Sequence, residues 1–262
     1  MTVPPITWLY VPADRPDRVE KAIGSPAHAV IVDLEDGVAS GAKAEARANL
    51  PALLGSAREK PVYVRVNAGD ADDLEAIAAL RLSGIFVPKV ARPEDVPAIG
   101  VPVHCLIESA AGLEAAHAIA SASGVAGISL GEADLRSETG ALEEGLGWAR
   151  SRIVNAAVAA GLPRPPQSVY PHVRDDEGLA RSCRRGRELG HLGRAAIHPA
   201  QLAIIEQAYL PAADEIEQAH ATIERLEAAG SGTLRDGEFV DVAMLGAARQ
   251  LVAIAERYGT AG

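Results

Sequence analysis

The chain has 262 residues, a formal net charge of −10 and only 3% aromatic residues. Its length is close to the roughly 250 residues of a typical (β/α)8 barrel and is enough to bury one large core. The negative charge argues against nucleic acids and anionic membranes as partners, because both carry charge of the same sign.

Three features of the composition favour a cytoplasmic protein. The first ten residues lack the basic start of a secretory signal, and no stretch approaches about 18 consecutive apolar residues. The two cysteines, Cys105 and Cys183, have no CxxC spacing and are too few for a disulfide framework. We therefore expect reduced thiols in a cytoplasmic protein without membrane contact.

Short apolar runs recur through the first 200 residues, and each contains or precedes a charged or hydrogen-bonding side chain. The segments between them have helical spacing, so the chain reads as a strand and a helix repeated eight times. This order predicts an α/β fold, a TIM (β/α)8 barrel, over residues 1–208. The predicted strands are 8–11, 29–34, 62–66, 85–88, 103–107, 127–130, 167–170 and 195–197.

The pattern changes after His198. Two longer helical stretches follow, 211–229 and about 240–258, separated by a turn-rich linker at 230–237. Residues 209–262 are therefore expected to form a C-terminal helical extension that docks on the barrel or on another subunit. His198 itself, at the end of the last predicted strand, fits a capping role better than that of a general base.

Two acidic residues, Glu108 and Asp134, follow the fifth and sixth apolar runs. Neighbouring strands lie about 4.8 Å apart, so carboxylates at corresponding heights can bind one ion between them. Mg2+ suits two carboxylates with several open positions, whereas a zinc site needs a cluster of His or Cys that is absent here. The alternative is that both acids pair with Arg65 or Lys89 in a structural network.

Arg65 lies in a period-2 run that points it to the same face as Tyr63 and Asn67. If that face is the barrel interior, the guanidinium stands in the barrel mouth, where its fork geometry matches a substrate carboxylate. A salt bridge to Glu35 or Glu108 is the alternative. An acidic cluster is expected to supply a residue that orients Arg65, and its members are Asp33, Glu35 and Asp36.

At these residues the sequence resembles the citrate lyase beta subunit-like family, part of the HpcH/HpaI aldolase superfamily. The matching stretches run in family order over nearly the whole chain. Two departures are Ala243, where a Pro usually follows the C-terminal acid, and residues 136–139, where the family commonly has Leu-Gly. The matching stretches are 9–16, 32–38, 64–67, 88–89, 107–109, 131–135, 196–199 and 236–241.

The resemblance implies a TIM barrel, usually a trimer or hexamer, that forms or cleaves a carbon–carbon bond beside a thioester carbonyl with Mg2+. It implies that Glu108 and Asp134 are the metal ligands and that Arg65, together with Glu108, holds the substrate. Asp241 matches an acid that reaches a neighbouring subunit's site. The positions that match contacts to coenzyme A are Tyr10, Arg15 and Lys21.

We therefore expect a Mg2+-dependent carbon–carbon lyase that cleaves a β-hydroxyacyl-CoA, of the malyl-CoA or citramalyl-CoA type, to an acyl-CoA and a small oxo acid. Asp241 is the first candidate for moving the proton. One alternative is a citrate lyase beta subunit that acts on an acyl carrier protein thioester. Others are a metal-dependent oxo-acid aldolase and, more remotely, a non-catalytic binding subunit.

Overall fold

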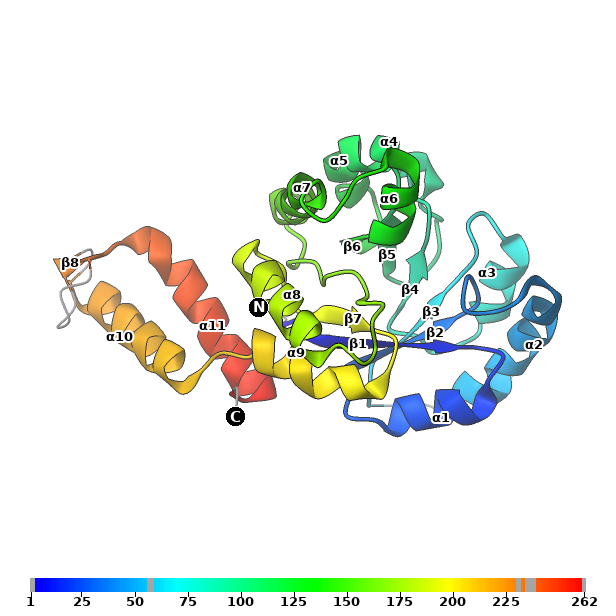
Figure 1. The fold of residues 1–262 in the computed structure, drawn as a ribbon, viewed down its shortest axis with the longest axis horizontal. Coiled ribbons are helices and arrows are strands. Elements are labelled where there is room, and N and C mark those ends of the chain that lie inside the picture. The colour runs from blue at the N-terminus through cyan, green and yellow to red at the C-terminus, as the bar shows by residue number, and fades with distance from the viewer. Residues whose placement is uncertain (1–2, 56–58, 230–231, 234–238, 261–262) are drawn as a thin grey trace. The chain divides into compact units, whose positions relative to one another are not determined.

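The computed structural model describes residues 3–55, 59–229, 232–233 and 239–260 (Figure 1). The chain divides into two compact units. One comprises Pro5–Ile205, and the other combines the first four residues with Glu206–Gly262.

The first unit is built on a seven-stranded sheet in which every neighbouring pair is parallel (Figure 1). The strand order is β6-β5-β4-β3-β2-β1-β7, so β1 to β6 follow one another in chain order and β7 pairs with β1 at the opposite edge from β6. An α/β fold with a curled parallel sheet is therefore confirmed. The strands are β1 (Thr7–Pro12), β2 (Ala29–Asp33), β3 (Val62–Arg65), β4 (Gly84–Val87), β5 (Val103–Ile107), β6 (Val125–Leu130) and β7 (Arg194–Ala196).

The strand predicted at residues 167–170 is wrong. This segment forms only an isolated parallel bridge, between Gln167 and Arg194. Pro165, Pro166 and Pro171 flank it, and a proline has no N–H to donate to a ladder. Among the described residues no continuous strand therefore joins β6 to β7, and the sheet is a curled half-barrel rather than a barrel closed by strand pairing.

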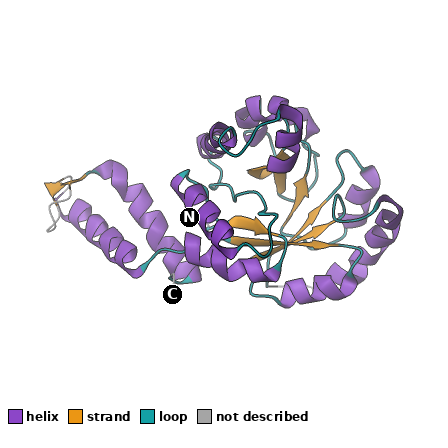
Figure 2. Cartoon of the chain, viewed as in Figure 1, coloured by secondary structure: helices purple, strands orange, loops and turns teal. Residues whose placement is uncertain are grey.

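Helices occupy the connections between the strands and surround the sheet (Figure 2). The strands are buried on both faces, as β2 and β5 show along their whole length, which is typical of a parallel sheet covered by helices. The helices are α1 (Pro16–Gly24), α2 (Lys43–Leu54), α3 (Ala71–Ile77), α4 (Ala110–Glu114), α5 (Ala116–Ala120), α6 (Glu132–Thr139), α7 (Leu146–Ala159), α8 (Asp176–Glu188) and α9 (Leu202–Tyr209).

The concave side of the sheet is filled by side chains from several strands. Trp8 lies at its centre, with its ring 5.7 Å from that of Phe86 and 5.2 Å from that of Tyr63. With Tyr10, this one cluster contains four of the chain's nine Phe, Trp and Tyr residues, and each contributes a large apolar area. The cluster also contains Ala29, Ile31, Leu106 and Ala195.

The second unit is a helical hairpin of α10 (Ala213–Ala229) and α11 (Leu245–Tyr258), which pack against each other. A short antiparallel pair, β8 (Gly232–Thr233) and β9 (Phe239–Val240), lies between the helices. Residues 236–238 of the family-like stretch lie outside the described residues. In the part of the chain that is described, no helix combines the length and apolarity needed to cross a membrane.

Gly193 offers a test of the close packing at the start of β7. Its φ is +82°, and a Cβ there would lie 2.2 Å from the carbonyl oxygen of Ile6. We expect Gly193→Ala to lower the free energy of unfolding by more than about 2 kcal/mol, since strain and a backbone clash add. Gly140→Ala is the control, because its φ is +71° but its Cβ would meet nothing within 4 Å. If denaturant unfolding shows that both variants lose the same free energy of unfolding, the proposed backbone clash at Gly193 is contradicted.

Candidate active site

A cavity of about 380 Å³ opens at the carboxyl-terminal ends of the strands. In parallel α/β folds these ends meet at one edge, where ligands usually bind. The cavity has an apolar floor and a charged rim. The floor includes Trp8, Ile31, Phe86 and Leu106, and the charged lining residues are Asp33, Asp36, Arg65, Glu108, Glu132 and Asp134.

Arg65 ends β3 directly opposite Asp33, the last residue of β2. Its Nε and Nη2 donate to the two carboxylate oxygens of Asp33 at 2.7 and 2.6 Å, and Nη1 lies 2.8 Å from Glu35. The guanidinium also stands 5.0 Å from the centre of the Tyr10 ring. The salt bridge to Glu35 considered from the sequence is thus present, and Asp33 fixes the orientation of Arg65 with a bidentate contact.

Glu108 follows β5 and is only 7% exposed. Its Oε2 accepts a hydrogen bond from the backbone N–H of Lys89 at 3.0 Å. Burial raises the pKa of Glu108 to about 7, with further increases from the charges of Glu35 and Asp134. Gly131 leaves room for this side chain, because a Cβ there would lie 2.4 Å from Glu108 Cγ.

Lys89 contributes its backbone to the site through an uncommon conformation. Its φ is +58°, in the left-handed region that non-glycine residues seldom adopt. Its ammonium group donates to Glu35 at 2.7 Å rather than to Glu108. The signal available in the sequence, Pro88-Lys89, does not reveal this backbone conformation.

Asp134 lies in the first turn of α6, just after β6, and is exposed. Within the described residues neither Asp134 nor Glu108 forms an ion pair, whereas the other acids of the rim are largely neutralised. The predicted alternative in which Arg65 or Lys89 pairs with these two acids is therefore wrong: both cations neutralise Asp33 and Glu35 instead. A pair of carboxylates is left without a counter-charge in one cavity.

The donor set fits Mg2+ better than a metal that needs an all-protein cage. In the described part of the chain no group of three or more His, Cys, Asp and Glu could hold a metal ion. Mg2+ commonly binds to one or two carboxylates and completes its shell with water and substrate oxygens. Glu108 and Asp134 could supply that pair.

The residues that match coenzyme A contacts are not gathered at the cavity. Tyr10 lines it, and burial raises the pKa of its hydroxyl above the ordinary value. Arg15 and Lys21 have side chains that are 59% and 80% exposed and lie near Asp14 and Asp17. Neither is among the residues that line the cavity.

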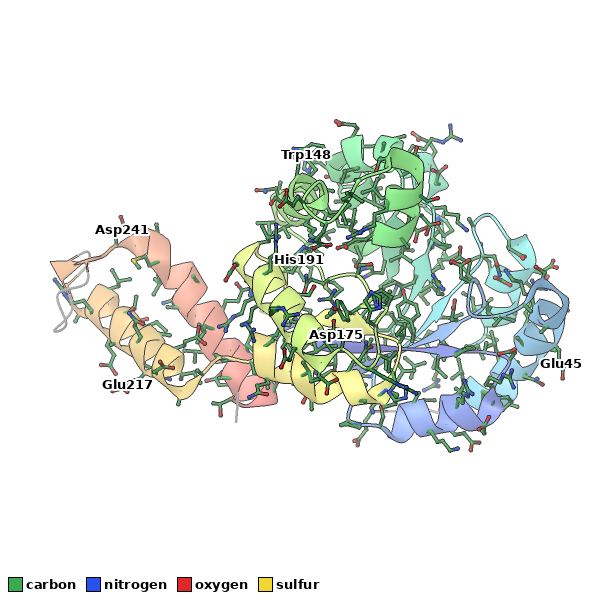
Figure 3. The ribbon with its side chains drawn as sticks, in the orientation of Figure 1. Glu45, Trp148, Asp175, His191, Glu217 and Asp241 are labelled. Carbon is green, nitrogen blue, oxygen red and sulfur yellow. The ribbon has the colours of Figure 1, made fainter. Side chains whose placement is uncertain are left out.

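Two further predicted residues have local roles. His198 accepts a hydrogen bond from Ala200 N at 3.1 Å and caps a short 3-10 helix, as the sequence suggested. Asp241, labelled in Figure 3, belongs to the second unit, where it accepts a hydrogen bond from Ala243 N at 2.6 Å.

The sequence did not reveal an ion pair that supports α6. Arg150, on α7, makes bidentate hydrogen bonds to Glu132 at 2.8 and 2.7 Å and is almost fully buried. This pair neutralises Glu132, two residues before Asp134, and fixes the start of α6. No local pattern could have identified it, because its partners belong to different helices 18 residues apart.

Comparison with known proteins gives matches over most of the chain. The family model described as HpcH/HpaI aldolase/citrate lyase matches residues 7–199. A (3S)-malyl-CoA thioesterase of Cereibacter sphaeroides is 36% identical, over 95% of this chain and 93% of that protein. An L-malyl-CoA/beta-methylmalyl-CoA lyase of the same species is 32% identical, with 95% and 93% covered.

Among solved structures, protein CitE from Mycobacterium tuberculosis, in complex with magnesium, acetoacetate and coenzyme A, is similar throughout. Its TM-score is 0.81 at 31% sequence identity, and the match covers 95% of this chain and 97% of that one.

The raised pKa of Glu108 predicts a pH-dependent stability. Because the folded state retains a proton that the unfolded state releases above pH 4.5, this carboxyl stabilises the fold at low pH, and that contribution is lost as pH rises through about 7. We expect Glu108→Gln to be more stable than the parent at pH 8, by up to about 3 kcal/mol, and similar at pH 4.

The measurement is denaturant unfolding in the absence of divalent cations at both pH values. The exposed Glu20 provides the control, since Glu20→Gln changes the same chemical group outside the cavity. A Glu108→Gln effect that is the same at pH 4 and pH 8 would contradict the assignment.

Proposed function

The chain belongs to the HpcH/HpaI aldolase/citrate lyase family, and we propose that it is a Mg2+-dependent carbon–carbon lyase acting on a β-hydroxyacyl-CoA of the malyl-CoA or citramalyl-CoA type. The predicted family membership is confirmed. The observation that carries the proposed activity is the pair of uncompensated carboxylates, Glu108 and Asp134, in one cavity with the guanidinium of Arg65.

Glu108 and Asp134 are proposed to hold Mg2+, as the family match and the magnesium-bound structural relative support. Bound there, Mg2+ would act as a Lewis acid and template for the substrate's carboxylate and hydroxyl oxygens. Glu108 would thereby also contact the substrate through the shared ion. Glu108 is itself almost fully buried, which strengthens the electrostatic contacts of its carboxylate.

Arg65 is proposed to stabilise negative charge on the substrate oxygen during cleavage. Three of its five N–H groups have carboxylate contacts on Asp33 and Glu35, which leaves two for a ligand. Asp33 thus holds the guanidinium in place without exhausting its donors. The products would be an acyl-CoA and a small oxo acid.

Coenzyme A is proposed to lie along Tyr10, Arg15 and Lys21, since the exposed cations on and before α1 are suited to phosphate groups. The protein is proposed to form a homotrimer or hexamer. Asp241 of one subunit is proposed to reach the active site of a neighbouring subunit and to transfer the proton there. Its carboxylate accepts a hydrogen bond from the backbone amide of Ala243 in the hairpin unit.

We also propose a complete (β/α)8 barrel over residues 1–208, with residues 209–262 as its helical extension at a subunit interface. The bridge between Gln167 and Arg194 supports residues 167–170 as the segment that completes the barrel between β6 and β7, although they do not form a continuous strand. A cytoplasmic location is proposed with it, consistent with two buried free cysteines.

A second candidate is hydrolysis of the same thioesters, favoured by the thioesterase relative at 36% identity. Products distinguish the two activities. A lyase converts a malyl-type CoA ester into an acyl-CoA and an oxo acid, whereas a thioesterase releases free coenzyme A and the hydroxy acid. Activity on free CoA esters would also argue against a strict requirement for an acyl carrier protein. Binding of coenzyme A in a calorimeter would argue against an aldolase that acts on oxo acids without a thioester.

Removal of either proposed metal ligand should abolish the Mg2+-dependent reaction. We expect Glu108→Ala and Asp134→Ala each to lower turnover of malyl-type and citramalyl-type CoA esters by at least about 1,000-fold, because both a ligand and the metal's electrostatic contribution are lost. Mass spectrometry of both products, with and without Mg2+, is the measurement.

Asp176→Ala is the matched control for Asp134→Ala, because Asp176 is an exposed acid in the first turn of another helix, α8. The control should keep parental turnover. Full activity in the double variant of Glu108 and Asp134 would end the proposal.

Arg65→Lys should reduce kcat/KM by at least about 100-fold, because an ammonium group cannot reproduce the bidentate contact with Asp33 and still face the substrate. Arg92→Lys makes the same change in an arginine–aspartate pair, with Asp95, that is exposed. Steady-state kinetics should separate the two variants, and equal effects would show that Arg65 has only a structural role.

A further inference from the structure

The floor of the cavity, which is largely apolar, includes a hydroxyl group that the proposed mechanism does not use. Ser129 lines the same cavity as Trp8 and Phe86 and is only 5% exposed. On the sheet it pairs with Leu106, two residues before Glu108 on the neighbouring strand. Ser129 therefore lies about 7 Å deeper along the strand direction than the proposed metal ligand.

His104 holds this hydroxyl group. Its Nε2 lies 2.7 Å from Ser129 Oγ, and its ring stacks on Phe86 with centres 4.2 Å apart. The ring also makes a backbone hydrogen bond with Ile128 that favours the protonated form. The ring must donate that bond to a carbonyl, so Nδ1 carries the proton and Nε2 of the neutral ring accepts.

Ser129 consequently donates its only proton to His104 and presents lone pairs to the cavity. Burial lowers the pKa of His104 to about 3, so the ring is a weak base and does not activate Ser129 as a nucleophile. The pair is instead a fixed hydrogen-bond acceptor in an apolar floor. An anion at this depth would meet oxygen lone pairs and aromatic rings.

The lining offers no free cation for such an anion. Among the described residues that line the cavity, Arg65 is the only cation. Asp33 and Glu35 occupy three of its N–H groups, and the proposed function assigns the other two to the reacting oxygen of the substrate. The five acids of the lining add repulsion. A buried charge without a partner is strongly disfavoured.

The orientation of the substrate follows from these constraints and rests on the proposed function. Charged and chelating oxygens belong at the rim with Glu108 and Asp134, and the coenzyme A arm, too large for a cavity of about 380 Å³, must leave by the mouth. The remaining group, the substituent on the oxo-acid carbon, then points to the floor. That group is hydrogen in glyoxylate, methyl in pyruvate and carboxymethyl in oxaloacetate.

We infer that Ser129, held by His104, is a specificity-determining residue, and that the floor accepts a hydrogen or a short alkyl substituent on the oxo acid and rejects a carboxymethyl group.

The test is calorimetric binding of oxo acids to the full chain at saturating Mg2+. We expect freshly dissolved oxaloacetate to bind at least ~50-fold more weakly than pyruvate. 2-Oxobutyrate separates charge from size, since its ethyl group approaches the carboxymethyl group in length but is neutral, and it should bind better than oxaloacetate.

Ser129→Ala should raise the affinity for pyruvate relative to that for glyoxylate by about fourfold or more, because the methyl group of pyruvate no longer covers the lone pairs of the Ser129 oxygen. His104→Leu frees the Ser129 hydroxyl to donate and should shrink the disadvantage of oxaloacetate several-fold. Ser182→Ala is the matched control: Ser182 Oγ also bonds a side chain, that of Arg194 at 2.9 Å, but lies outside the cavity lining. It should leave every ratio unchanged.

Circular dichroism and thermal unfolding establish that the variants are folded. The inference is overturned if oxaloacetate binds the parent as tightly as pyruvate, if Ser129→Ala leaves the pyruvate to glyoxylate ratio unchanged, or if no oxo acid binds. Thioester cleavage is scored separately. Selective binding without cleavage would refute the lyase proposal alone, and cleavage without selectivity would refute only the role of the floor.

Discussion

The bidentate contact between Arg65 and Asp33 determines the charge balance of the whole cavity. Asp33 and Glu35 pair with Arg65, the one cation among the described lining residues, and Glu108 and Asp134 are left without an ion pair there. Burial raises the pKa of Glu108 most, and the neighbouring charges of Glu35 and Asp134 raise it further. Such a cavity repels anionic substrates unless a cation enters with them, which is the physical reason to propose a divalent metal at this position.

The backbone around the acidic residues is shaped to admit their side chains. A Cβ on Gly37 would lie 2.5 Å from Asp33 Oδ2, and one on Gly131 would lie 2.4 Å from Glu108 Cγ. Lys89 adopts a positive φ where its N–H reaches Glu108. Each carboxylate is thus positioned by close backbone contacts, which restrain it more tightly than long side chains could.

The apolar runs were sufficient to predict seven strands and their order, because a buried parallel strand reads as a short continuous apolar run. Residues 167–170 misled the same reasoning, because the prolines on both sides of this segment lack N–H donors and limit its pairing to one bridge. The polar strand ends identified Arg65, Glu108 and Asp134 as residues of one cavity. His104 and Ser129 carried no signal, because their pairing across 25 residues depends on strand register and on the curl of the sheet.

The rim and the floor of the cavity therefore favour ligand groups of opposite polarity. At the rim, carboxylates lack counter-charges and favour a ligand that brings a cation and chelating oxygens. At the floor, the Ser129 hydroxyl donates its proton to His104, so an uncharged group is favoured. A substrate with chelating oxygens and a small neutral substituent fits the cavity in only one orientation, with the oxygens at the rim and the substituent at the floor. In this orientation its thioester arm points toward the mouth. Orientation of the substrate thus follows from where the chain leaves charge unpaired and where it does not.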